Sequence, residues 1–331
     1  LIVLSKIMNL IKILFFILLI FKPEILSANE GFNSWVKNFK KYAVEQGVNQ
    51  ATVDTAFKNV KFLEKIITYD RRQPEFIEKT NVYIKKRINI KKIQSAKALI
   101  KSNRELLNKI EKEFNVPANY LVALWGIETH FGRHKGKVDI ISALSTLSYD
   151  KRRSEFFSKE LLILLKLIDK KIIKLDSLVG SWAGAHGNFQ FMPSSIQNFA
   201  IDYDNNNNID LYVSLNDSFA SAANYLKKIG WDKNPWGFKI KLEKEINSKY
   251  IGTDARKLKK KLAIKKWKKL GVKLPDSVKI NENLKARLIR PDGKSGDYYL
   301  VLNNYEKLLH WNRSLRFAIT IGIFADYLKN V

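Results

Sequence analysis

A carboxylate at the end of an apolar run is the residue best suited to chemistry in this chain. Glu128 follows the apolar run Leu121–Ile127 and precedes Thr129–Gly132. Burying an ionised, unpaired carboxylate costs several kcal/mol, so such a group stays protonated at neutral pH or finds a partner. A carboxylic acid kept neutral by apolar neighbours can pass a proton to a leaving oxygen. A structural ion pair is the alternative, because such pairs also shift pKa values.

A glycine-rich stretch, Gly180–Ser195, forms the second candidate element. Gly180, Gly184 and Gly187 can let the backbone approach a ligand closely or take up a positive φ. A tight connection between helices is the alternative, since glycine is common in loops.

Oxygen-bearing side chains alternate along the polar tract 202–210. They are Asp202, Asp204, Asn206 and Asn208. This spacing resembles an EF-hand-like calcium loop, although Asn207 replaces the glycine at the sixth position and Val213 replaces the glutamate at the twelfth. Asp217 could supply the missing carboxylate. We expect either a structural calcium or sodium ion here, or an Asx-rich turn that needs no ion.

The composition excludes several classes of site. The chain has 331 residues, 46% of them hydrophobic, which is enough for a sizeable core in one or two domains. It contains no cysteine, which excludes disulfides, thiolate catalysis, Cys-based metal sites and a lipoprotein anchor. The net charge of +27 would attract a polyanion. Abundant Lys, Ile and Asn are typical of an AT-rich coding sequence, so part of this charge is discounted.

The N-terminus is predicted to be a signal peptide covering residues 1–28. Lysine-flanked apolar residues Ile13–Phe21 precede a small-residue cleavage site, Leu26-Ser27-Ala28. Residues 1–7 precede Met8 and could come from an over-extended gene start. We therefore expect a periplasmic protein, and an uncleaved inner-membrane anchor is the alternative. Export also argues against a nucleic-acid partner.

Apolar spacing predicts a mainly α fold with a small β component (α+β). Expected helices include 96–114, a helix from about Pro117 to Gly132 that carries Glu128, two pieces within 144–168, then 219–229 and 314–328. Short β-prone segments at 239–242, 286–289 and 298–301 predict a small sheet. The lysine-rich run 257–269 around Trp267 forms a basic amphipathic patch, which most often means a solvated helix face.

Several separate blocks resemble the membrane-bound lytic murein transglycosylase B family, glycoside hydrolase family 103. They are Asp70–Phe76, Leu124–Gly132, Ala143–Tyr149 leading into Arg152-Arg153, Gly180–Ser195 and Trp311–Ser314. The resemblance implies a lysozyme-like helical core with additional helical and small-sheet lobes. We accordingly expect an N-terminal helical region (29–120), a catalytic core (121–238) and a C-terminal lobe whose closing helix returns to the core (239–331).

The resemblance also implies an activity, which is cleavage of the MurNAc-β-1,4-GlcNAc bond of peptidoglycan to leave 1,6-anhydro-MurNAc ends. In the family a single Glu acts first as acid and then as base, which here would be Glu128. The residues expected to contact substrate are Ser181, Gln190, Arg153, Asn312, Trp311 and Phe317. Trp311 and Phe317 stand where relatives often carry Tyr, so they keep an apolar surface for sugar rings but lose the phenolic hydroxyls.

Two other functions stay open from the sequence. A hydrolytic muramidase would need a second carboxylate to position water, and Asp139 and Glu155 are the candidates. A catalytically silent peptidoglycan-binding scaffold is the other. We expect no cofactor for catalysis, glycan strands as the partner, a monomer, and at most a weak contact with the anionic wall or membrane surface.

Overall fold

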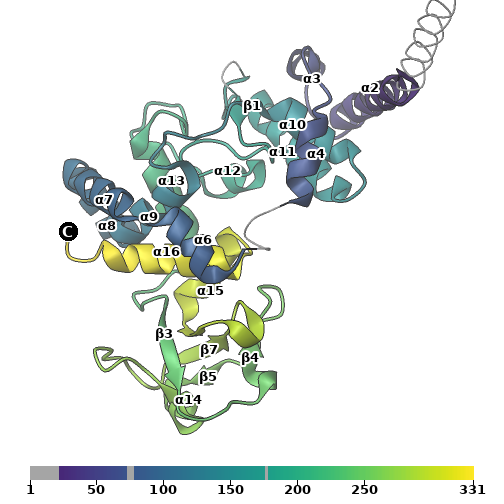
Figure 1. Cartoon of the computed structure of the whole chain (residues 1–331). Coiled ribbons are helices and arrows are strands. Elements are labelled where there is room, and N and C mark those ends of the chain that lie inside the picture. The colour runs from purple at the N-terminus through teal and green to yellow at the C-terminus, as the bar shows by residue number, and fades with distance from the viewer. Residues whose placement is uncertain (1–21, 73–77, 176–177) are drawn as a thin grey trace, which may run out of the picture. The chain divides into compact units, whose positions relative to one another are not determined.

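The computed structural model describes residues 22–72, 78–175 and 178–331, with side chains described from residue 30 onward (Figure 1). Two compact units interleave along the sequence: Leu1–Asp70 with Val138–Gly184, and Arg71–Lys137 with Ala185–Val331. The contiguous segments expected from the sequence divide the chain differently and stay a prediction. So does the signal peptide, most of which lies outside the described residues. Within the described ranges, none of the helices is both long enough and apolar enough to cross a bilayer.

The first unit is built around one buried helix, α10. Its elements are α2 (Lys22–Glu45), α3 (Gln50–Phe57), α4 (Glu64–Arg71), β1 (Val138–Asp139), α10 (Ile140–Tyr149), α11 (Ser154–Asp169) and β2 (Val179–Gly180). The hydroxyls of Ser142 and Thr146 on α10 accept the backbone N–H groups of Lys61 and Leu63, each at 3.0 Å. These bonds satisfy polar groups inside an otherwise apolar helix, so α10 can be buried along nearly all of its length.

The second unit places helix α9 at its centre. Its helices are α6 (Thr80–Arg87), α7 (Ile90–Ser102), α8 (Arg104–Phe114), α9 (Ala118–Thr129), α12 (Pro193–Phe199), α13 (Leu215–Lys228), α15 (Asn303–Trp311) and α16 (Leu315–Tyr327). Helices α7, α8, α13 and α16 all pack against α9. Residues 120–126 of α9 are buried, as expected for a helix that is apolar on every side.

The single helix expected over 96–114 is wrong. The chain breaks at Asn103, between α7 and α8, where the backbone leaves the helical region (φ −113°, ψ 21°). The Asn103 side chain donates to Leu99 O at 2.9 Å. Asparagine competes with the helix ladder for backbone partners in this way, and spacing of apolar residues alone does not register the competition.

The small sheet lies in the C-terminal part of the second unit, grouped with α14 (Ile264–Lys269) (Figure 1). Its strands are β3 (Gly237–Leu242), β4 (Ile251–Gly252), β5 (Leu262–Ala263), β6 (Val272–Lys273), β7 (Lys285–Ile289) and β8 (Tyr298–Val301). The order is β4-β7-β8-β3-β6, with β5 also paired to β7. Leu300 in β8 is in register with Leu288 of β7 on one side and Phe238 of β3 on the other. The three strands expected from the sequence are confirmed.

Trp267 lies in the core of this lobe and not on its surface. It is fully buried, and its indole N–H donates to Ala286 O at 2.9 Å. The lysines beside it in α14 are exposed, and the helix spans only Ile264–Lys269. The lysine run is therefore a solvated face over a packed tryptophan. The mainly α fold class with small sheets is confirmed.

Candidate active site

Helix α9 ends one residue after Glu128, in a sharp turn. His130, Phe131 and Gly132 all have positive φ, at 52°, 60° and 79°. The helix thus ends three residues before Gly132, where the sequence placed its end. A left-handed conformation costs a non-glycine residue roughly 1–2 kcal/mol, so surrounding contacts must hold this turn. At Gly132 a Cβ would lie 2.7 Å from Asn188 Oδ1, and only glycine fits.

Asn188 supplies the contacts that hold the turn. Its Oδ1 accepts the indole N–H of Trp125 at 3.0 Å, and its backbone carbonyl accepts the Thr129 hydroxyl at 2.8 Å. Its amide nitrogen donates to Leu211 O at 3.2 Å and to Ser218 Oγ at 3.1 Å. The side chain is only 2% exposed. Asn188 thereby joins the glycine-rich stretch to the helix that carries Glu128, a role that sequence reasoning did not assign to it.

The Glu128 carboxylate is partly buried and accepts a hydrogen bond from Trp311. The indole Nε1 lies 2.9 Å from Glu128 Oε1. The Trp311 ring contacts Tyr225, Phe191 and Phe189 edge to face, with centroids 4.7, 5.4 and 6.3 Å away. The structure thus brings two of the sequence-predicted site residues into direct contact, although Trp311 was expected to contact a sugar and not the carboxylate.

A lysine that sequence reasoning missed lies at the same end of α9. Lys92, from α7, donates to Gly126 O at 3.0 Å. Gly126 is among the last four residues of α9, whose carbonyls have no partner within the helix, and a cation there also suits the helix dipole. Burial, and secondarily repulsion from Arg87, lowers the pKa of Lys92. Burial, followed by the charge of Lys92, likewise lowers the pKa of His130.

Three further predicted residues lie in the same unit as Glu128. Gln190 has φ 51°, and its Nε2 donates to Lys135 O at 3.1 Å and to Gly187 O at 2.9 Å, which fixes the plane of the amide. Asn312 is half-buried directly after α15. Phe317 is only 3% exposed, so it is part of the core. The sugar-stacking role expected for Phe317 stays a prediction, and its burial does not favour it.

Ser181 and Arg153 lie in the first unit. Ser181 Oγ accepts the N–H of Ala183 at 3.3 Å. Arg153 bonds through Nη2 to Asp70 Oδ1, and Arg152 Nε lies 2.8 Å from Asp70 Oδ2. Asp70 is only 2% exposed. The guanidinium expected to face a substrate carboxylate is thus already paired with a buried protein carboxylate, a partner the sequence did not reveal.

The two candidates for a second carboxylate also lie in the first unit. Asp139 Oδ1 accepts the N–H of Ser142 at 2.7 Å and so caps helix α10. Glu155 is exposed in the first turn of α11, where a negative charge suits the helix dipole. Each residue has a structural reason to be where it is.

The polar tract folds as a loop that concentrates carboxylate oxygens. Ligand oxygens of Asp202, Asp204 and Asp217 lie within 4.8 Å of one another. Asn207 takes φ 64°, which asparagine tolerates better than most residues, so it can replace the glycine of the sixth position. Val213 is 74% exposed and offers no ligand.

Asp217 is the buried member of this oxygen cluster. It is fully buried and accepts the backbone N–H groups of Tyr203 at 2.8 Å and Asp210 at 2.9 Å. Burial, and to a smaller extent the neighbouring Asp204 and Asp202, raises the pKa of Asp217 against the effect of these bonds. An all-oxygen set with crowded negative charge fits a hard cation such as calcium.

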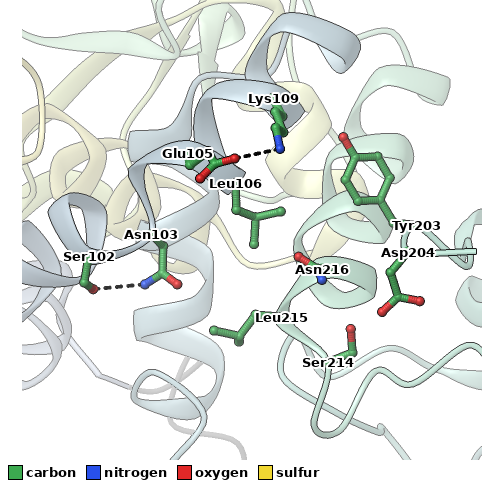
Figure 2. Close-up of a pocket in the computed structure, with 10 residues that line it drawn as sticks. All are labelled: Ser102, Asn103, Glu105, Leu106, Lys109, Tyr203, Asp204, Ser214, Leu215 and Asn216. Atoms are coloured by element: carbon green, nitrogen blue, oxygen red, sulfur yellow. Dashed lines mark hydrogen bonds and ion pairs between the residues drawn. The ribbon is translucent and has the colours of Figure 1, made fainter. Parts of the chain in front are cut away.

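A cavity of about 590 Å³ lies beside this loop (Figure 2). It is lined by α8 residues such as Glu105 and Lys109, which pair with each other at 2.8 Å, and by Tyr203 and Asp204 of the loop. None of the residues expected to bind sugar lines it. We assign it no part in the chemistry of Glu128.

Comparisons with known proteins support one family. The family model for the transglycosylase SLT domain matches residues 31–326. Membrane-bound lytic murein transglycosylase B of Escherichia coli (strain K12) is 32% identical over 242 residues, which cover 72% of this chain and 64% of that protein.

Similar solved structures support the same family. SltB3 from Pseudomonas aeruginosa in complex with NAG-NAM-pentapeptide matches with a TM-score of 0.82 at 30% identity, over 91% of this chain and 80% of that one. Escherichia coli Slt35 in complex with calcium matches with a TM-score of 0.75 at 26% identity, over 91% and 93%. The chain belongs to the transglycosylase SLT domain family. The lytic transglycosylase resemblance drawn from its motifs is confirmed.

Replacing Asn188 by alanine should destabilise the second unit by about 2–4 kcal/mol, because it leaves the buried Trp125 N–H without its acceptor and removes the side-chain bonds to Leu211 O and Ser218 Oγ. Urea unfolding would measure the change. Asn224→Ala is the matched control, since that side chain makes one bond, to Phe199 O at 2.8 Å, and should cost about 1 kcal/mol. Equal losses in the two variants would contradict the role given to Asn188.

Proposed function

We propose that this protein is a lytic transglycosylase that cleaves the MurNAc-β-1,4-GlcNAc bond of peptidoglycan and leaves 1,6-anhydro-MurNAc ends. The observation that carries the proposal is the placement of Glu128: it lies in the last turn of a buried helix, is itself partly buried, and accepts an indole N–H at 2.9 Å. Family membership and the NAG-NAM-pentapeptide bound to SltB3 support peptidoglycan as the substrate.

Glu128 performs both proton transfers in the proposed reaction. As the acid it protonates the glycosidic oxygen while the bond from that oxygen to C1 breaks, which releases the GlcNAc side as an alcohol. The C6 hydroxyl oxygen of the muramoyl sugar then bonds to C1, and Glu128, now a carboxylate, takes the hydroxyl proton. The atoms balance without water, and Glu128 returns to its starting state.

The surroundings of Glu128 suit a group that acts first as an acid and then as a base. The apolar, largely buried helix favours the neutral acid, whereas the Trp311 N–H favours the carboxylate. An acid that must become a base requires opposed influences of this kind, because neither form can be strongly favoured.

The remaining substrate contacts are proposed as the sequence suggested them. They are Ser181, Gln190, Arg153, Asn312, Trp311 and Phe317. Arg152 and Arg153 share one carboxylate, so the pair keeps a net positive charge that could attract a lactyl or peptide carboxylate.

Hydrolysis with a second carboxylate and binding without turnover remain the alternatives to this proposal. Against hydrolysis, Asp139 has a capping role and Glu155 is exposed. We also propose export to the periplasm, action as a monomer, and no cofactor for catalysis.

We propose a structural calcium ion in the loop of Asp202, Asp204, Asn206 and Asn208, completed by Asp217. The clustered oxygens and the calcium bound in Slt35 support it. The ion would offset most of the negative charge of three close carboxylates and fix the loop against α13. It takes no part in the proposed proton transfers.

The product decides between the reactions. Mass spectrometry of muropeptides released from purified peptidoglycan by residues 29–331 should find muramoyl ends lighter by one water. Full-mass reducing ends would instead establish hydrolysis. If nothing is released while the protein still binds the sacculus, the scaffold alternative holds.

Glu128→Gln should reduce turnover by at least about a thousandfold, because an amide can neither give nor take the proton. Folding and glycan binding should remain, since the amide can still accept from Trp311. Asp139→Asn, which can still cap α10, and Glu155→Gln are matched controls and should each stay within about threefold of the native rate. A large loss in either control would reopen the hydrolytic mechanism.

Calcium should raise the melting temperature, with a gain in stability of about 2.7 kcal/mol when its concentration is 100 times Kd. Asp217→Asn should remove most of this gain, whereas Asp254→Asn, an exposed carboxylate in the C-terminal lobe, should keep it. Differential scanning calorimetry with and without a chelator makes the comparison. No gain in the native protein would mean that the loop is an Asx turn without an ion.

The calcium effect should also weaken in mild acid. The raised pKa of Asp217 means that protons compete with the ion at a higher pH than for an ordinary Asp. Without calcium the sign reverses: a carboxyl whose folded-state pKa is raised disfavours folding above that pKa, so its penalty fades as the pH falls.

A further inference from the structure

Trp311 contacts the Glu128 carboxylate directly, and its indole nitrogen can only donate a hydrogen bond to it. An indole nitrogen donates a hydrogen bond and accepts none. In the bond between Trp311 Nε1 and Glu128 Oε1, at 2.9 Å, the oxygen is therefore always the acceptor. This holds whether Glu128 is protonated or ionised.

The direction of this donor is fixed by packing. Trp311 contacts Tyr225, Phe191 and Phe189 with interplanar angles of 73°, 64° and 70°. Phe189 and Phe191 are each 3% exposed, and the Tyr225 hydroxyl lies 3.0 Å from His310 Nδ1. Burial raises the pKa of Tyr225 to about 12, so this neighbour stays a neutral phenol at working pH.

We propose that Trp311 is a positioning residue which reserves Glu128 Oε1 as an acceptor and so makes Oε2 the oxygen that exchanges the proton. A protonated carboxyl group has one O–H, and its carbonyl oxygen is the better acceptor, so the Trp311 N–H on Oε1 favours placing the proton on Oε2. The proposal rests on the proposed function. It adds which oxygen of Glu128 exchanges the proton and which residue selects that oxygen.

The same bond stabilises the carboxylate more than the acid, because a hydrogen bond to an ionised acceptor is the stronger one. A tyrosine at this position could both donate and accept, so its hydroxyl could rotate and leave either oxygen available. Trp311 removes that freedom. The aromatic ring can still pack against a sugar, but its nitrogen serves the carboxylate.

Other charged groups near this pair must be separated from it in any titration. They are Lys92, His130, Arg133 and His134 at the end of α9, Tyr225, Lys307, His310 and Arg313 around α15, and Arg316 and Asp326 on α16. Glu111 lies at the other end of α9, where it accepts the Ala118 N–H at 2.9 Å. Burial first, then nearby cations, lowers the pKa of both His130 and His310. Arg316 pairs with Asp292, and Asp326 accepts the Trp236 indole N–H.

The pairing can be tested without turnover, by NMR of the indole N–H groups. The chain has seven tryptophans, and the Trp311 signal is assigned as the one missing in Trp311→Phe. The chemical shift of its indole proton should change with pH in the native protein and stay constant in Glu128→Gln, because an amide does not ionise. A Trp311 signal that titrates equally in both proteins would report a neighbouring histidine and overturn the pairing.

Kinetics on peptidoglycan tests the positioning itself. Trp311→Phe keeps the ring and loses the donor, so the alkaline limb of the pH profile should move up by about one pH unit and kcat should fall about tenfold with KM unchanged. Trp311→Tyr should restore part of the loss. The matched control is Trp231→Phe, which removes an indole N–H from the ring packed on Tyr120 and should change neither quantity.

The outcomes separate this inference from the proposed function. If Trp311→Phe raises KM while leaving kcat and the pH profile unchanged, Trp311 only stacks on sugar and the positioning role is wrong. If the native protein releases nothing from peptidoglycan, the proposed function fails, and the NMR titration alone then decides whether Trp311 and Glu128 are coupled.

Discussion

The buried amide of Asn188 is the constraint on which the candidate site depends. It joins two segments about sixty residues apart, the end of helix α9 and the glycine-rich stretch, through bonds at both ends of its side chain and through its own carbonyl. The turn after Glu128 has three consecutive residues with positive φ, two of them not glycine. Such a turn persists only where its surroundings hold it, and Asn188 with Thr129 provides that hold.

In this arrangement the residues that hold helix α9 in place differ from the residue that would carry out the chemistry. The bonds of Trp125 and Thr129 lie on the buried side of α9, and Glu128 turns its carboxylate to Trp311. The acid therefore sits on the last turn of a helix that cannot shift without breaking buried hydrogen bonds. A group that must meet a glycosidic oxygen and then a hydroxyl gains from such rigidity, because small misplacements slow proton transfer strongly.

The local features of the fold and of the candidate site could be predicted from the sequence. The apolar run before Glu128 predicted a buried helix, β-prone segments predicted β3, β7 and β8, and alternating oxygens predicted a loop whose carboxylates do converge. It could not supply pairs made by distant residues. Nothing near Arg153 in sequence indicates Asp70, and nothing near Glu128 indicates Trp311 or Lys92. The complete burial of Trp267 could not be predicted for the same reason, since its acceptor carbonyl belongs to a strand that follows it.

The pairing of Arg152 and Arg153 with Asp70 changes how an anion could be recognised there. Two adjacent guanidinium groups repel each other, and a buried carboxylate between them offsets that repulsion while fixing both forks. The three groups together keep one positive charge. A ligand carboxylate would then meet oriented donors without having to hold two flexible arginines in place, so less side-chain entropy is lost on binding. Asp70 thus removes part of the positive charge of the two arginines and in return fixes the orientation of their donors.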